Sequence, residues 1–258
     1  MFRYSYLFTQ LVRRELRQKY QGSALGVVWY LVNPLMLMAV YGMMLGPLLK
    51  AVSIRNYPIF ILAGLLVWLF FSQSLLTAST SLVEHAPLVS QVRFPRQTIP
   101  AAVVTVQLVP MAAMLIILVP LARALEGGVS ASQLLLIPLL ICLFAFTLGL
   151  ALFVAALHAY FRDVQPIVTA LLLPLFFLSG VLFRLQSLPG LQAHRWIEPL
   201  LRWVNPIAPF IEAVRSVLYD GRVPAATVLV YVLAAALVSL AGGVLLFRRL
   251  DPELAVVL

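Results

Sequence analysis

The sequence predicts an all-α integral membrane protein with six transmembrane helices, an amphipathic interface helix before them, and short re-entrant helices between spans five and six. Of its 258 residues, 63% are hydrophobic and only 10% are charged. The mean hydropathy of +1.03 is far above that of a soluble domain. Six runs without Asp, Glu, Lys or Arg are long enough to cross a hydrocarbon layer of about 30 Å. They cover residues 27–49, 58–81, 99–122, 133–157, 166–183 and 225–247.

The N-terminal segment, residues 1–26, has the pattern of a helix that lies in the membrane interface. Leu7, Leu11 and Leu16 fall near one helical face, and the cations are interleaved with them: Arg13, Arg14, Arg17 and Lys19. Such a helix serves as an anchor or as a contact surface for a protein partner. Because cations flank cytoplasmic ends of spans, we expect this terminus in the cytoplasm, and an even number of spans places the tail 248–258 there too.

Two connections between the spans are long enough to form structure. Residues 82–98 offer a short helix followed by a proline-fixed turn that bears Arg93 and Arg96. Residues 184–224 place Trp196 and Trp203 seven positions apart, on one helical face, and Pro189, Pro199, Pro206 and Pro209 divide the segment into short pieces. Short pieces with a tryptophan face are typical of an interfacial or re-entrant segment, and an ordinary loop outside the membrane is the alternative.

Aromatic and amide side chains within the spans are candidates for lining a path through the membrane. Tyr30, Asn33 and Tyr41 fall near one face of the first span. Sugar rings stack on such faces, so an aromatic wall of this kind can guide a glycan. The full candidate set is Tyr30, Asn33, Tyr41, Trp68, Phe70, Phe71, Phe176 and Phe177. The alternative is that these aromatics pack between helices or form an interfacial belt.

Patterns of catalysis and metal binding are missing from these 258 residues. There is no His-Glu-x-x-His, no Gly-x-Ser-x-Gly and no paired cysteine, since Cys142 is the single cysteine. His85, His158 and His194 lie in three different connections, which disfavours a shared metal site. The net charge of +9 has its largest cluster beside the first span, so we expect anionic membrane lipids as its partner and no nucleic acid.

No energy source for transport is visible either. The lysines are Lys19, after Gln18, and Lys50, after Leu49, so there is no Gly-Lys-Ser/Thr to cradle ATP phosphates. An ion-coupled carrier would bury charged groups at membrane depth, and the six runs contain none. The sequence therefore favours a membrane subunit driven by a partner, with an ion-coupled secondary transporter as the alternative from another class.

Four stretches, in order along the chain, resemble the permeases of type-2 ABC exporters in the polysaccharide and polyol-phosphate export family. The first is residues 14–26, which lead into Trp29 and Asn33-Pro34. The others are Ala86-Pro87-Leu88 with Phe94-Pro95-Arg96, then Tyr160-Phe161-Arg162-Asp163-Val164, and finally Asn205-Pro206 followed by Glu212, Arg215 and Gly221. Phe161 departs from the family pattern, in which the tyrosine stands next to the arginine, and leaves Tyr160 without an assigned role.

The resemblance implies one transporter domain over residues 1–258, with an interface helix in 1–26, five spans in 27–183, gate helices in 184–224, a sixth span in 225–247 and a cytoplasmic tail in 248–258. It implies a homodimer around one channel, docked on two copies of an ABC ATPase subunit. The ATPase would bind ATP and Mg, so this chain needs no cofactor. It assigns the coupling role to Glu84, His85, Pro87, Leu88, Arg93, Phe94, Pro95 and Arg96. It assigns the gate to Trp196, Trp203, Asn205, Glu212 and Arg215.

The resemblance also implies the cargo and the location. We expect a lipid-linked, O-antigen-like polysaccharide as the substrate, exported across the bacterial cytoplasmic (inner) membrane. Capsular polysaccharide and teichoic acid remain open, because aromatic side chains recognise sugars generically. Export of a drug or small lipid is the alternative within the same superfamily.

Overall fold

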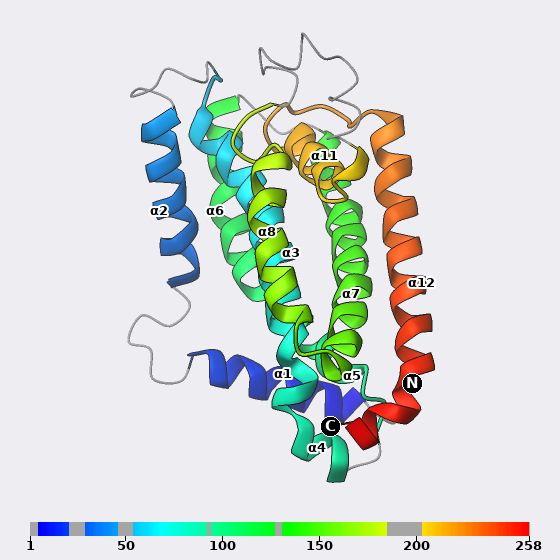
Figure 1. The fold of residues 1–258 in the computed structure, drawn as a ribbon. Helices are drawn as coiled ribbons and strands as arrows, with labels where there is room; N and C mark the ends of the chain where they lie inside the picture. Colours follow the sequence, from blue (N-terminus) through cyan, green and yellow to red (C-terminus); the bar gives the residue numbers. More distant parts are fainter. Residues whose placement is uncertain are drawn as a thin grey trace.

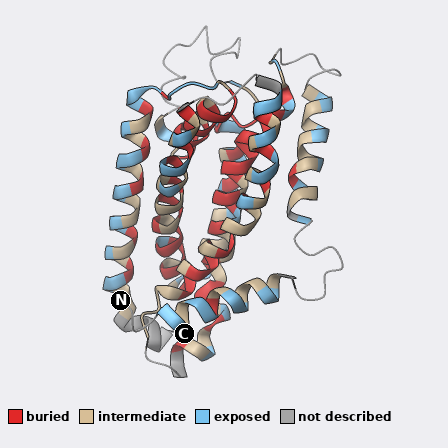
Figure 2. Cartoon of the chain, turned by 180° about the vertical axis from the view of Figure 1, so that it is seen from behind, coloured by how far each residue is buried: buried red, intermediate tan, exposed pale blue. Residues whose placement is uncertain are grey.

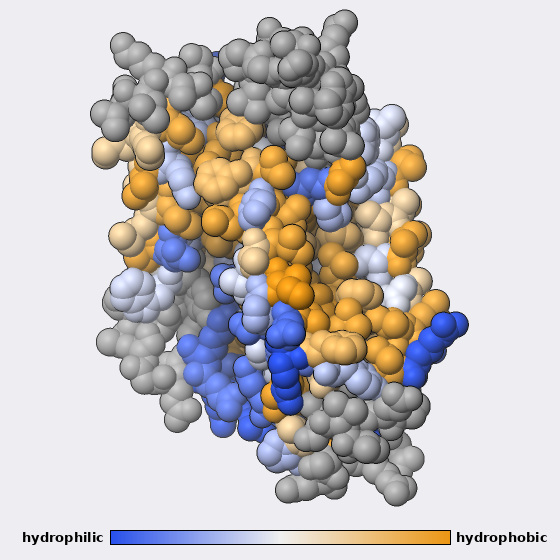
Figure 3. All heavy atoms as spheres, viewed as in Figure 1, coloured by the Kyte–Doolittle hydropathy of each residue, from blue (hydrophilic) through white to orange (hydrophobic). Residues whose placement is uncertain are grey.

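The computed structural model describes residues 5–20, 29–45, 54–91, 94–126, 131–184 and 203–257. Within these ranges the regular elements are helices. Most of them run side by side through the length of the molecule, whereas α1 (Ser5–Tyr20) lies across one end (Figure 1). On the face shown in Figure 3, apolar residues cover the middle of the molecule, and hydrophilic residues gather toward the end that carries α1.

Helix α1 is amphipathic as predicted. Leu11 on its inner face is only 5% exposed and packs in a small apolar cluster with Leu82, Ile99, Ala155 and Phe247, which come from four other helices. The exposed positions include Arg13, Arg14 and Arg17. Burial of the apolar face therefore fixes a helix that is too polar to enter the bilayer core.

Helix α3 (Tyr57–Glu84) is the central element of the bundle. Its side chains are buried almost without interruption from Ile59 to Phe71. Buried positions concentrate on the central helices and exposed ones on the outer helices (Figure 2). Helix α2 (Trp29–Met43) stands beside α3, and the short helix α4 (Ala86–Gln91) follows α3 after a turn at His85.

The third predicted span is interrupted. Helix α5 (Thr98–Val106) ends one residue before α6 (Leu108–Glu126) begins, and the turn between them is Gln107. Pro110 explains the interruption, because it has no N–H to donate to the carbonyl of Val106 four positions earlier. The apolar run predicted one helix here, whereas the structure has two in succession.

Helices α7 (Leu136–Tyr160) and α12 (Ala226–Val257) cross at close range. The 3-10 helix η4 (Ala131–Leu135) leads into α7. A side chain at Gly243 would collide with the backbone carbonyl of Gly149, so both glycines are required by the approach of the two backbones. The Ser239 hydroxyl donates to the carbonyl of Phe146 at 2.8 Å beside this crossing.

Six helical segments correspond to the six predicted runs, whereas α1, α4 and α11 (Ala208–Leu218) lie outside these runs. Four helical segments are long and apolar enough to cross a membrane: Tyr57–Glu84, Thr98–Ala124, Ser132–Tyr160 and Ala226–Asp251. The other two, Leu31–Met43 and α8 (Val164–Leu178), are shorter apolar helices. Fifteen helical residues rise about 22 Å, less than the hydrocarbon thickness of about 30 Å. That these two helices cross the whole hydrocarbon layer, and that the protein has six spans, therefore stay predictions.

The structure differs from the prediction in the outer segment, residues 184–224, and in the last span, residues 225–247. One short helix, α11 (Ala208–Leu218), lies inside the bundle within the predicted outer segment, and nine of its residues are buried. Its length of about 16 Å is too short to cross a bilayer. Helix α12 does not end at Phe247, since it continues through the predicted tail to Val257.

Candidate functional site

Three of the predicted channel residues converge on a hollow between α2, α3 and α8. We call this hollow, of about 300 Å³, the α2–α8 groove; its walls include Tyr41, Trp68 and Phe176. The ring centroids of Tyr41 and Phe176 are 6.0 Å apart, and those of Trp68 and Phe176 are 5.4 Å apart. Phe177 makes an edge-on contact with Phe176 at 5.3 Å and is 45% exposed. The groove thus offers aromatic faces next to exposed apolar surface.

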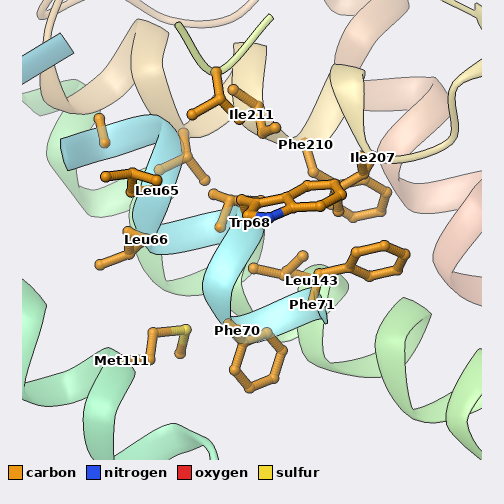
Figure 4. Close-up of a cluster of buried hydrophobic side chains, with 14 of the residues drawn as sticks. Leu65, Leu66, Trp68, Phe70, Phe71, Met111, Leu143, Ile207, Phe210 and Ile211 are labelled. Atoms are coloured by element: carbon orange, nitrogen blue, oxygen red, sulfur yellow. The ribbon is translucent and has the colours of Figure 1, made fainter. Parts of the chain in front are cut away.

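The remaining channel candidates lie elsewhere. Phe71 stacks on Phe146 of α7, with ring centroids 5.9 Å apart, and Phe146 stacks in turn on Phe210 of α11. Figure 4 shows Trp68, Phe70 and Phe71 among buried apolar side chains of neighbouring helices. Phe71 packs between helices, whereas Trp68 also lines the groove and Phe70 lines a second cavity. The channel role of these three residues stays a prediction. The side chain of Tyr30 lies outside the described residues, so Tyr41 and Phe177 remain the most accessible aromatics of the set.

A second cavity, which includes the predicted Asn33, lies toward the α1 end. We call it the Lys19 cavity; it has a volume of about 430 Å³. Polar groups in its wall come from α1, α2, α3 and the turn at Gln107, and apolar groups come from α2, α3 and α6. The lining residues are Lys19, Trp29, Asn33, Pro34, Leu66, Leu69, Phe70, Gln73, Thr77, Gln107, Pro110, Met111 and Met114.

Lys19 behaves differently from the arginines of the same helix. Arg13, Arg14 and Arg17 are exposed, whereas Lys19 is half-buried and its Nζ donates to Oε1 of Gln107 at 2.7 Å. Burial lowers the pKa of Lys19 from 10.5 to about 8, against an opposing effect of the Glu15 carboxylate. The sequence grouped all four cations together, but the structure separates Lys19 from the rest.

The predicted coupling segment is joined to α1 through His85. Nε2 of His85 lies 3.0 Å from Oε1 of Glu15, and its Nδ1 lies 2.8 Å from the carbonyl of Ser81. The hydrogen bond to Glu15 raises the pKa of His85 above 6.5, burial opposes that rise, and the Ser81 carbonyl supports it. Glu84 and Pro87 on either side are exposed and Leu88 is half-buried. Sequence reasoning missed Glu15, although it stands one helical turn before Lys19.

The second half of the coupling segment contacts the end of α12. Nη1 of Arg96 lies 3.3 Å from Oδ1 of Asp251 and also donates to the Asp251 carbonyl. Nearby, the Tyr160 hydroxyl donates to the carbonyl of Leu250 at 3.0 Å, which gives that tyrosine a structural contact. Phe94 and Pro95 are half-buried, and Arg93 lies outside the described residues.

The predicted gate contains a buried arginine. Arg215 in α11 is 7% exposed and donates to the carbonyls of Gly180 and Val181, each at 2.9 Å. Its guanidinium carbon lies 3.6 Å from the ring centroid of Phe60, a cation–π contact. A side chain at Gly64 would collide with the guanidinium. Arg215 therefore fastens α11 to the chain that follows α8.

The other described gate residues lie just before α11 and within it. Asn205 accepts from the N–H of Ile207 and donates to the Leu175 carbonyl, which joins the start of α11 to α8. Trp203 packs on Tyr231 of α12 with ring centroids 5.1 Å apart. Glu212 is half-buried in α11, and Trp196 lies outside the described residues.

Comparisons with known proteins agree with this architecture. The ABC-2 type transporter family matches residues 6–219. The chain is 31% identical over 256 residues to the O-antigen export system permease protein RfbA of Myxococcus xanthus, covering 99% of this chain and 96% of that one. It is 27% identical over 220 residues to the RfbA permease of Klebsiella pneumoniae, covering 84% and 82%. It is 25% identical over 248 residues to the polysialic acid transport protein KpsM of Escherichia coli, covering 92% and 91%.

These similarities confirm the resemblance that the four stretches indicated, and they extend from α1 through α12. The family match begins in α1 and ends just after α11. The chain belongs to the ABC-2 type transporter family of membrane permeases.

Proposed function

We propose that this chain is the permease subunit of an ATP-driven exporter that moves a lipid-linked polysaccharide across the bacterial cytoplasmic membrane. The observation that carries the proposal is the similarity to an O-antigen export permease over 99% of the chain. The similarity to a polysialic acid transport protein keeps capsular polysaccharide as a second cargo. Teichoic acid, or a drug or small lipid, would fit the same permease class.

The second part of the proposal concerns partners. Two copies of this chain would form the channel, and two copies of an ABC ATPase subunit, holding ATP and Mg, would drive it. The exposed Glu84 and Pro87 flank the start of α4 and offer a docking point for the ATPase. This arrangement places α1 and both termini in the cytoplasm, in accordance with the exposed cations of α1.

The α2–α8 groove is the part of this chain that we assign to the glycan path. Tyr41 offers a partly open aromatic face there, and the exposed Phe177 contacts Phe176 of the groove wall. Other exposed apolar residues of α2 and α8 lie near them, such as Val40 and Leu173. A second copy that covers this apolar surface would convert the groove into one side of an enclosed channel.

Export from living cells tests the proposal. In a strain that lacks the gene for this chain, surface polysaccharide should disappear and should return with the wild-type gene. Tyr41→Ala should lower surface polysaccharide severalfold without changing the amount of folded permease, because Tyr41 is half-buried and lines the groove. Tyr41→Phe keeps the ring and should export nearly normally. Met36→Ala is the matched control, since Met36 is 61% exposed on the same helix and does not line the groove.

Two outcomes separate the parts of this proposal. Unchanged surface polysaccharide after deletion of the gene would refute the export function. Normal export by folded Tyr41→Ala would leave the export function intact and would remove the groove from the glycan path.

A further inference from the structure

The Lys19 cavity has the shape of a site for an amphiphile with a negative head. Its polar groups form a chain: Lys19 donates to Gln107, and Gln107 Nε2 donates to the Thr77 hydroxyl at 3.2 Å. The rest of the lining is mainly apolar and includes Leu66 of α3 and Met111 and Met114 of α6. One cavity therefore brings a cation and amides next to a hydrocarbon surface.

Lys19 is the only charged residue among the described lining residues of this cavity. None of the lining residues that the structure describes is acidic. Glu15, one turn before Lys19, is not among the lining residues; it is in contact with His85, and its carboxylate opposes the effect of burial on Lys19. Burial disfavours the charged form of a lysine, so an anion in the cavity would recover part of the lost solvation.

The position of the cavity fits a lipid better than a soluble anion. Lys19 lies at the end of α1, which runs across the ends of the spans, and Trp29 at the start of α2 is 54% exposed, as expected at a membrane interface. The ammonium group of Lys19 points inward to Gln107 of the third span, which differs from a lysine that reaches out to bulk lipid headgroups.

We propose that the Lys19 cavity binds the phosphate-bearing head of a membrane lipid, with Lys19 as the charged contact, Gln107, Thr77 and Asn33 as polar neighbours, and the first part of the lipid chain along Leu66, Met111 and Met114. The lipid belongs to the leaflet that contains α1. A bulk anionic phospholipid and the isoprenoid phosphate carrier of a lipid-linked glycan share this chemistry, and the experiment below distinguishes them. The proposal does not depend on the export function.

Native mass spectrometry of the full-length permease in detergent tests the site. With added phosphatidylglycerol we expect one tightly retained lipid per chain, and none with a diacylglycerol of the same chains, which lacks the phosphate. Lys19→Gln should bind about tenfold more weakly, because it removes one charge-assisted hydrogen bond from a partly buried site. Lys19→Arg should retain binding. Arg17→Gln removes the same charge from the exposed face of α1 and should change the affinity by less than about twofold.

The outcomes divide clearly. Equal affinities of Lys19→Gln and Arg17→Gln, equal retention of diacylglycerol, or binding of inorganic phosphate as tight as that of the lipid would each refute the site. If Lys19→Gln fails to fold, Asn33→Leu at the same cavity decides: weaker lipid binding supports the site and unchanged binding refutes it. Retention of a polyprenyl phosphate over phosphatidylglycerol would identify the glycan carrier as the occupant, and equal retention would identify a bulk lipid.

Discussion

The two ends of the helix bundle are held together in different ways. At the α1 end, several polar contacts join separate elements: Glu15 to His85, Arg96 to Asp251, and Tyr160 to the backbone at Leu250. The α11 end has contacts of this kind as well, such as Arg184 to Asp220, but it also contains one guanidinium, that of Arg215, which is buried and satisfies two backbone carbonyls. The contacts at the α1 end involve separate residues, so the loss of one leaves the others in place. Arg215, by contrast, makes two buried hydrogen bonds with one side chain, so its loss removes both.

The largest effect should come from Arg215→Met at the α11 end. It leaves the carbonyls of Gly180 and Val181 without their donor, and each buried unsatisfied group costs about 1 to 3 kcal/mol. We expect the free energy of unfolding of the purified permease to fall by about 3 kcal/mol. Arg222→Met, at an exposed position just after α11, is the control. Equal unfolding temperatures for the two variants would contradict the concentrated role of Arg215.

An intermediate effect, with a pH dependence, is expected at His85. Its folded-state pKa is raised above 6.5, so the stability from protonated His85 is fully present below pH 6.5 and is lost as the pH rises through the raised value. The groups that face it are Glu15, the Ser81 carbonyl and the repelling Arg14. His85→Asn should cost about 1 kcal/mol at low pH and almost nothing at high pH.

Thermal unfolding of wild type, His85→Asn and Glu15→Gln across about pH 5.5 to 8.5 checks this prediction. Both variants should lack the loss of stability that the wild type shows with rising pH. A wild-type profile that is parallel to those of the variants would exclude a titrating pair. Because His85 lies at the start of α4, ATP-driven transport by the same variants would also show whether this pair matters for coupling.

The smallest effect is expected for Arg96→Gln. Asp251 is 41% exposed, and surface ion pairs contribute less than about 1 kcal/mol. The difference from wild type should shrink further at high salt, because screening weakens exposed pairs. Arg249→Gln, at an exposed position of α12, is the control. A loss as large as that of Arg215→Met would overturn the contrast between the two ends.

Much of the fold was predictable because a helix that crosses the membrane needs a long run of apolar residues. Each uncharged run became helical, the third as two helices in succession, and the alternation of leucines and arginines in residues 1–26 became the amphipathic helix α1. The interruption at Gln107 was not predicted, because glutamine and the proline three residues later do not break an apolar run. The extension of α12 beyond Phe247 was also missed, since Arg248 and Arg249 resemble the end of a span but are good helix formers.

The candidate site was less predictable, because its contacts join residues far apart in sequence. The spacing of Tyr41 could not show that its neighbour would be Phe176, 135 positions later, nor that Phe71 would stack on α7. Likewise, nothing in the pattern around Arg215 indicates a buried guanidinium, because the two acceptors are main-chain carbonyls that carry no sequence signal. Glu15 offered a weak signal, since it shares a helical face with Lys19 one turn away.

Helix α12 is longer than the hydrocarbon layer is thick. Its 32 residues span about 48 Å, whereas the hydrocarbon layer is about 30 Å thick. About three turns of the helix therefore exceed the hydrocarbon thickness. Asp251 lies close to the C-terminal end of α12, so its contact with Arg96 joins that end of the helix to the predicted coupling segment. A spin label on the last turns of α12 would report any tilt of the helix, because the displacement grows with the distance from the point about which the helix tilts.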